Sequence, residues 1–380
     1  MTQTTSQWSS VLNNWAAQMV DSTLQRYTLR DARWHYEHGL LVMAILQAGI
    51  SINEERYMQF ASQWVDHFVQ ADGGIRTYQI EEFNLDQINA GKLIFHAYRQ
   101  TGQKRYRQAL HLLREQLNKQ PRTHAGGFWH KQIYPYQMWL DGLYMAGPFY
   151  AEYAQAFAEP AGFDDVTQQI LLAEMKMRDP QTGLLYHAWD ESKEQRWADP
   201  VTGCSPHFWG RGMGWYTMAL VDVLDFLPDD HPRRSDLIAI LARLVEAVAR
   251  VQDQATGLWY QILDQAERAG NYLESSASSM FVYAIAKGAR QGYLANGALQ
   301  IARRGFQGLV EKFVSTDEQG LSNLNGTCSV AGLGGNPYRD GSFEYYVSEP
   351  VVANDYKGLG AFILAAVEIE HASANKHSAI

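Results

Sequence analysis

The stretch Ser275-Ser-Ala-Ser-Ser-Met-Phe-Val-Tyr-Ala-Ile-Ala286 decides the predicted fold. As a helix it is apolar nearly all round and rich in small residues, which is typical of a helix buried on every side. Five further stretches have the same character, and they begin at Gly39, Ala90, Gly142, Gly214 and Lys357. The sequence therefore predicts six buried inner helices.

The segments between the inner helices have one polar face, as in Arg233-Arg-Ser-Asp-Leu-Ile-Ala-Ile-Leu-Ala-Arg-Leu244, and we expect them to be outer helices. Helical periodicity predicts twelve helices and no strand pattern is convincing. The expected ranges are 7–26, 35–48, 52–70, 86–101, 103–118, 137–158, 164–177, 213–227, 233–253, 276–292, 294–314 and 353–370.

A weak internal repeat supports a pairing of outer with inner helices. Gly127-Phe-Trp-His130, Gly183-Leu-Leu-Tyr-His187 and Gly257-Leu-Trp-Tyr260 each follow an outer helix and lead into an inner one. Six such hairpins, with their inner helices facing one another, close into an all-α (α/α)6 toroid that spans residues 1–380 as a single domain. An open solenoid is the alternative, but it would leave the inner helices without a partner across the axis.

Composition restricts the possible partners. The net charge is -9, and no run of Lys or Arg forms the basic face that a nucleic acid or an anionic membrane requires. Residues 1–20 lack the basic start and apolar core of a signal peptide, and no apolar run is long enough to cross a bilayer. We interpret Cys204 and Cys328 as reduced thiols, and we therefore expect a cytoplasmic protein. We expect it to be a monomer or a homodimer.

Long loops lead into the inner helices at 119–136, 178–212, 254–274 and 315–352, and loops of this length are usually functional. Aromatic residues are abundant, with 11 Trp and 21 Tyr, and flat rings suit the apolar faces of sugars. We expect the loops to line one mouth of the toroid with Trp129, His130, Lys131, Tyr134, His187, Trp189, Trp197, His207, Trp209, Arg211, Trp215, Trp259 and Tyr338.

Two acids are candidates for catalysis. Asp141 lies among aromatic and aliphatic side chains, and no cation occurs three or four residues away to keep it ionised, which favours a raised pKa and a general acid. Asp86 opens the second inner helix as Asp141 opens the third, so the two carboxyls are expected at the same mouth. The alternative for both is a structural acid at a helix start.

Arg211 lies in Gly210-Arg-Gly-Met-Gly-Trp215, where a guanidinium could bind a carboxylate with two hydrogen bonds while Trp209 and Trp215 stack on a ring. The segment follows no strand and lacks the dinucleotide-binding pattern. His35 with His38, and His124 with His130, have no third ligand at helical spacing, so we predict no metal and no cofactor.

The stretches Trp139-Leu-Asp-Gly-Leu-Tyr-Met-Ala-Gly-Pro-Phe149 and His207-Phe-Trp-Gly-Arg-Gly-Met-Gly-Trp215 resemble the unsaturated rhamnogalacturonyl hydrolases of glycoside hydrolase family 105. The similarity runs from Trp34 to Ile369, and the related family 88 unsaturated glucuronyl hydrolases share the toroid and the paired acids. The resemblance implies an oligosaccharide substrate with a 4,5-unsaturated uronic acid at its non-reducing end.

By this resemblance Asp141 protonates C4 of the unsaturated sugar and then directs water onto C5, and Asp86 is the second acid, which assists or binds the sugar. The resemblance assigns substrate binding to Arg211, Trp209, Trp215, His187, His130, Lys131 and Tyr36. The alternatives are a family 88 activity on glycosaminoglycan disaccharides, a toroidal sugar isomerase or epimerase, and a carbohydrate-binding toroid without catalysis.

Overall fold

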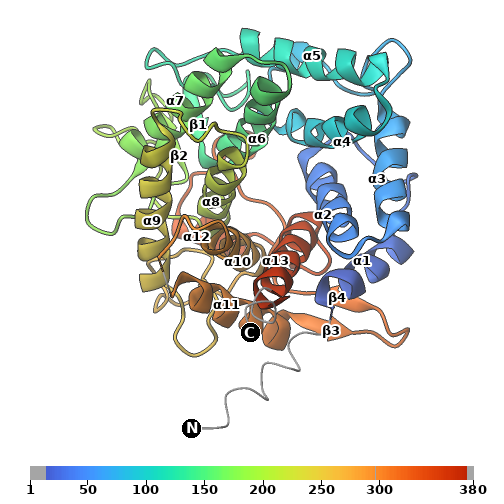
Figure 1. The fold of residues 1–380 in the computed structure, drawn as a ribbon. Helices are drawn as coiled ribbons and strands as arrows, with labels where there is room; N and C mark the ends of the chain where they lie inside the picture. Colours follow the sequence, from blue (N-terminus) through green and yellow to red (C-terminus); the bar gives the residue numbers. More distant parts are fainter. Residues whose placement is uncertain (1–13, 296, 375–380) are drawn as a thin grey trace.

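The inner helices form a closed ring. The structure is a computed structural model that describes residues 14–295 and 297–374. Within these residues six helices surround a common axis (Figure 1): α2 (Tyr36–Ile52), α4 (Lys92–Thr101), α6 (Leu140–Ala156), α8 (Gly210–Leu224), α10 (Ser275–Arg290) and α13 (Tyr356–Ala374). Each helix packs on the next, and α13 packs on α2. The predicted toroid is therefore confirmed, and the open solenoid is wrong.

An outer layer covers this ring. Six helices of the described chain compose it: α1 (Trp15–Arg26), α3 (Glu55–Phe68), α5 (Lys104–Lys119), α7 (Pro160–Met177), α9 (Arg234–Arg250) and α11 (Ala298–Phe313). The six expected outer helices are therefore present, and residues 7–13 of the first lie outside the described residues. Figure 1 shows the outer helices around the ring, each beside an inner helix.

Burial explains the two sequence patterns. In α10 every residue from Ser275 to Gly288 is buried, because neighbours in the ring and α11 surround it. Its buried hydroxyls are hydrogen-bonded, some within the helix, as when Ser278 Oγ donates to the Glu274 carbonyl at 2.7 Å, and some to neighbouring segments, as when Ser275 Oγ bonds to Thr327 Oγ1. In contrast, α3 buries one stripe, which consists of Tyr57, Ala61, Trp64, Val65 and Phe68.

The second inner helix begins later than expected. Residues 80–91 contain three short 3₁₀ turns, η1 (Ile80–Glu82), η2 (Leu85–Gln87) and η3 (Asn89–Gly91), and α4 begins only at Lys92. Asp86 therefore lies in η2 and not at the start of an α-helix. Asn84 is the capping residue, since its side-chain oxygen accepts a hydrogen bond from the Asp86 N–H at 3.1 Å.

Three short antiparallel ladders and one short helix were not predicted. The ladders pair β1 (Gln137–Trp139) with β2 (Ala188–Asp190), β3 (Val314–Thr316) with β4 (Ser322–Leu324), and β5 (Thr327–Cys328) with β6 (Val351–Val352). The helix is α12 (Phe343–Ser348). Strands of two or three residues are too short to show alternation, so no sequence period reveals them. These ladders hold the long loops against one end of the ring.

Two further expectations concern the state of the two cysteines and the absence of membrane-spanning helices. Cys204 and Cys328 are both buried and form no disulfide. Among the described helices, none combines the length and the apolar character needed to cross a lipid bilayer.

Close helix contact in the ring generates a stability prediction. A Cβ atom added at Gly39 would lie 2.8 Å from the Ala90 backbone, so Gly39→Ala forces α2 away from η3. We expect a loss of about 1–3 kcal/mol in the free energy of unfolding, measured by denaturant titration. The control is Gly147→Ala in α6, where a Cβ would meet a single methyl group at 3.3 Å. An equal loss in both variants would contradict the close-packing argument.

Candidate active site

The N-terminal ends of the inner helices meet at one mouth of the ring and bring the candidate residues together. Tyr36, Asp141 and Arg211 lie in the first turns of α2, α6 and α8. Glu274 is the N-cap of α10, and Asp86 lies just before α4. Helix N-termini carry partial positive charge, so this end of the ring favours anionic groups.

Asp141 is held by a histidine from a distant loop. Its Oδ2 lies 3.1 Å from Nε2 of His187, which directly precedes β2. The His187 side chain is fully buried, and the Asp141 side chain is 14% exposed. Within the described chain, Asp141 Oδ1 has no hydrogen-bond partner. The sequence argument placed His187 at the mouth but considered only neighbours of Asp141 along the helix, so it did not predict this contact.

A tyrosine fixes the orientation of His187. The Tyr346 hydroxyl lies 2.7 Å from His187 Nδ1, and burial raises the pKa of Tyr346 well above its ordinary value, so the phenol keeps its proton. Both ring nitrogens are satisfied when Tyr346 donates to Nδ1 and the Nε2–H donates to Asp141. This arrangement leaves Asp141 Oδ1 as the carboxyl oxygen that can exchange a proton with a substrate.

Asp86 is an ionised carboxylate with a cation beside it. Lys131 Nζ lies 2.6 Å from Asp86 Oδ2, and His130 Nε2 lies 3.5 Å from Oδ1. Burial raises the pKa of Asp86, but the charge and the hydrogen bond of Lys131 act against it, and the pKa lies below its ordinary value. The environment of Asp86 suits a charged binding group more than a proton donor.

His130 belongs to an aromatic stack rather than to a charged pair. Its ring stacks on Trp139 at 4.9 Å, and Tyr134 stacks on the same indole at 4.8 Å. Burial lowers the pKa of His130 to about 4, so the imidazole is neutral near pH 7. Gly142 makes room for it, because a Cβ there would lie 3.0 Å from His130 Nδ1.

Arg211 is a buried cation whose charge is balanced by Glu274. Its Nη1 donates to the Cys328 carbonyl and to Ser276 Oγ, and lies 4.0 Å from Glu274 Oε1. Glu274 is itself fully buried and accepts from the Cys328 and Ala277 N–H groups. In the described part of the chain, Nε and Nη2 of Arg211 have no acceptor, so two donors are available for a ligand.

Tyr36 links these groups electrostatically. Burial raises the pKa of its phenol well above the ordinary value, the negative charges of Glu37, Asp86 and Asp141 raise it further, and Arg211 lowers it. Both predicted acids and the predicted cation therefore act on the same hydroxyl. Among the described residues no group forms a hydrogen bond with Tyr36, which leaves this hydroxyl for a ligand.

Trp209 and Trp215, which precede and follow Arg211 in the sequence, are both buried, and each is 1% exposed. Trp209 packs against His187 and Tyr346, and the Arg211 guanidinium lies 4.9 Å from its ring. Trp215 stacks on Tyr144 at 4.9 Å. Their observed contacts are with protein, and stacking on a sugar stays a prediction for both.

Other expectations for the mouth are changed by the structure. Trp259 was expected there, but it is fully buried against α10, and its indole N–H donates to the Val248 carbonyl of α9 at 2.8 Å. Sequence reasoning missed Glu274, Tyr346 and Trp139. Only Trp139 had a local signal, since it stands two residues before Asp141; the others depend on the folding of distant segments.

The histidine pairs do not assemble a metal site. His38 Nδ1 lies 2.8 Å from the Tyr27 hydroxyl, and His124 Nδ1 lies 3.0 Å from Glu191 Oε2. Across residues 14–295 and 297–374, no three His, Cys, Asp or Glu side chains are grouped as metal ligands.

Comparison with known proteins decides the family. The model of Glycosyl Hydrolase Family 88 matches residues 9–373. The chain belongs to this family. A solved family 105 glycoside hydrolase from C. acetobutylicum ATCC 824 is similar over 94% of this chain and 100% of its own, with 48% identity and a TM-score of 0.92. The protein is therefore a glycoside hydrolase of the group that comprises families 88 and 105. The enzymes of this group act on unsaturated uronyl sugars.

Two further relatives show how far the similarity extends. The unsaturated rhamnogalacturonyl hydrolase YesR of Bacillus subtilis is 27% identical over 70% of this chain and 74% of its own length. The unsaturated glucuronyl hydrolase of Bacillus sp. GL1 is 13% identical, with a TM-score of 0.69 over 94% of this chain and 96% of that one. The second likeness shows the shared fold alone.

The contact between Tyr346 and His187 predicts a positioning role for the tyrosine. Tyr346→Phe removes the donor to Nδ1, so the imidazole can adopt the wrong tautomer toward Asp141. We expect kcat to fall roughly tenfold, which corresponds to about 1.4 kcal/mol, with an altered pH profile of kcat. The matched control is Tyr345→Phe, since that hydroxyl instead accepts from the Gly332 N–H at 3.0 Å. Equal kinetics in both variants would remove the role.

Proposed function

We propose that the enzyme removes a 4,5-unsaturated galacturonic acid linked to rhamnose from the non-reducing end of pectin-derived oligosaccharides. The observation that supports it most is that two groups with free atoms lie in first turns at the same mouth. Asp141 is a carboxyl with one unpartnered oxygen, and Arg211 is a guanidinium with two free donor nitrogens. The first group can deliver a proton, and the second can bind the uronate carboxylate. The name of the YesR relative supports rhamnose as the neighbouring sugar.

The reaction begins with proton transfer. Asp141 gives the proton on Oδ1 to C4 of the sugar, the double bond opens, and positive charge develops at C5 and the ring oxygen. Water adds to C5 and returns one proton to Asp141, which acts as base. His187 holds Oδ2 in place through its Nε2 atom.

The glycosidic bond then breaks without a nucleophile. The product of hydration is a hemiketal at C5, whose bond to the ring oxygen breaks to give a ketone. The remaining hemiacetal at C1 releases the neighbouring sugar as an alcohol and becomes an aldehyde. Asp86 therefore needs no nucleophilic role, and its pairing with Lys131 suits a residue that binds sugar hydroxyls.

We place this activity in the cytoplasm, on fragments imported into the cell. Two buried cysteines without a disulfide are what a reducing compartment favours. An activity on glucuronyl disaccharides of glycosaminoglycans is the second candidate, which sulfate-binding cations would favour. Lys131 at the mouth already pairs with Asp86, so it is not free for that purpose.

The central prediction concerns Asp141→Asn. With an unsaturated galacturonyl-rhamnose disaccharide, the wild-type enzyme should abolish the ultraviolet absorbance of the conjugated double bond, and the variant should lose at least about a hundredfold in rate. Asp229→Asn is the matched control, because its side chain is 98% exposed. Unchanged absorbance with an isomerised sugar would instead indicate an isomerase, and a preference for a glucuronyl disaccharide would support the second candidate.

The role of Arg211 is tested by Arg211→Lys. Replacement by alanine would leave Glu274 buried without its cation and destabilise the fold, whereas lysine keeps the charge and loses the planar pair of donors. We expect KM for the disaccharide to rise about tenfold with little change in kcat, if the carboxylate is bound equally in ground and transition states. Steady-state kinetics provide the measurement, and an unchanged KM would remove this role.

A further inference from the structure

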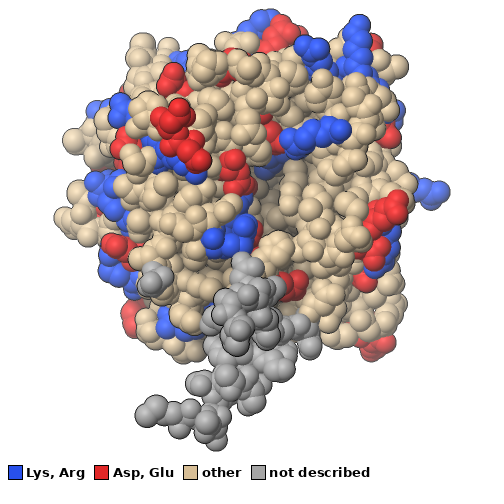
Figure 2. All heavy atoms as spheres, in the orientation of Figure 1, with Lys and Arg blue, Asp and Glu red and all other residues tan. Residues whose placement is uncertain are grey.

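A polar cavity lies at the end of the ring opposite the mouth that contains Asp141. Its volume is about 320 Å³, and its walls come from all six inner helices, largely from their C-terminal halves. Figure 2 shows the end of the ring that carries the C-terminus of α13, with the surface hollowed near its centre. None of the lining residues takes part in the proposed reaction, so the cavity needs an explanation of its own.

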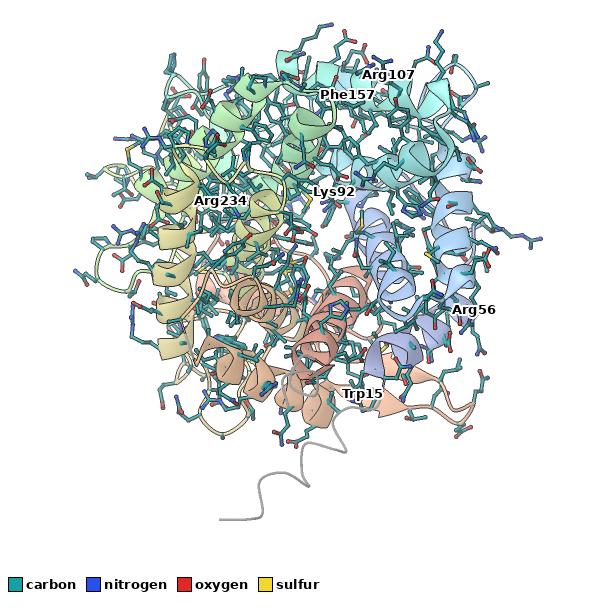
Figure 3. The ribbon with its side chains drawn as sticks, viewed as in Figure 1. Trp15, Arg56, Lys92, Arg107, Phe157 and Arg234 are labelled. Carbon is teal, nitrogen blue, oxygen red and sulfur yellow. The ribbon has the colours of Figure 1, made fainter. Side chains whose placement is uncertain are left out.

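Lys92 is the residue that gives this cavity its chemistry. Its side chain is buried, with 6% of the residue exposed, and Figure 3 places it near the centre of the ring. Its Nζ lies 4.0 Å from the centre of the Tyr144 ring, and no acceptor among the described residues receives a hydrogen bond from it. An ammonium group carries three donors, and Lys92 lines the cavity, where a bound group can accept hydrogen bonds from them.

The acids around the cavity are already engaged. Each of the four lining carboxylates pairs with another cation: Glu152 with Arg99, Asp222 and Asp225 with Lys287, and Glu368 with Arg290. Asp222 and Glu152 act on Lys92 only through longer-range attraction. Burial raises the pKa of Glu152 to about 7, so the lining has less negative charge near neutral pH than its composition suggests. Lys92 is thus the lining cation without a partner anion.

We propose that this cavity binds a small hydroxylated monocarboxylate of monosaccharide size, whose carboxylate accepts hydrogen bonds from Lys92. The Lys92 ammonium pairs directly with none of the lining carboxylates, so it can bind the single negative charge of such a ligand. The volume lies at the lower end of the range for ligand sites, roughly 300–1,000 Å³, which suits a single sugar acid. The amide side chains of Gln47 and Gln291 line the same cavity and can serve hydroxyl groups as donors or acceptors.

The first test needs no variant and uses D-galacturonate as the probe. Burial lowers the pKa of Lys92 to about 8, so at pH 8 much of the amine is uncharged and open to reductive methylation. We expect galacturonate, and not neutral D-galactose, to slow methylation of Lys92 at least fivefold, as measured by peptide mass spectrometry. Lys119, whose side chain is 59% exposed, is the internal control and should be unaffected. Equal labelling of Lys92 with and without galacturonate would overturn the proposal.

Calorimetry then separates this cavity from the catalytic mouth, which could also bind a uronate. Galacturonate binding that depends on Lys92 should weaken at least tenfold in Lys92→Met, recover in Lys92→Arg, and persist in Arg211→Lys. Binding that persists in Lys92→Met and disappears in Arg211→Lys would assign the ligand to the catalytic mouth alone and refute the second site. If Lys92→Met does not fold, the labelling result on the wild-type enzyme decides.

Discussion

Closure of the inner ring is the constraint on which the rest of the structure depends. The last inner helix, α13, packs on the first, α2, and small residues allow the contact: a Cβ at Gly360 would lie 2.7 Å from Leu40. Because the inner helices run in the same direction around the axis, closure brings their N-terminal ends together. Residues far apart in the chain, such as Asp86 and Arg211, therefore share one mouth.

Charge at this mouth is balanced by groups from different segments. Asp86 pairs with Lys131 of the next loop, and Arg211 pairs with Glu274 at the start of α10. Each pair is largely buried, so removal of one member would leave the other uncompensated at a high energetic penalty. Asp141 differs, because its partner is the imidazole of His187, which also contacts the Tyr346 hydroxyl, and not a lysine or an arginine. The same site thus contains charged binding groups and one carboxyl suited to proton exchange.

An aromatic path connects the two ends of the ring. Tyr36 at the mouth that contains Asp141 packs edge-on against Trp215. Trp215 stacks on Tyr144, whose ring contacts the Lys92 ammonium. The interior is therefore filled between the two polar regions. This separation gives each end of the ring its own electrostatic environment.

The sequence by itself determined the layers of this protein, because burial on all sides or on one side leaves a local pattern in every helix. It also indicated Asp141, Asp86 and Arg211, which stand near helix starts beside aromatic or glycine residues. It could not show the 3₁₀ turn at Asp86, the short ladders, or the contacts of His187 with Asp141 and Tyr346. Those contacts join residues 46 and 159 positions apart, and only ring closure sets such distances. Helical periodicity is local, whereas the environment of a buried charge is decided by whatever the tertiary fold places next to it.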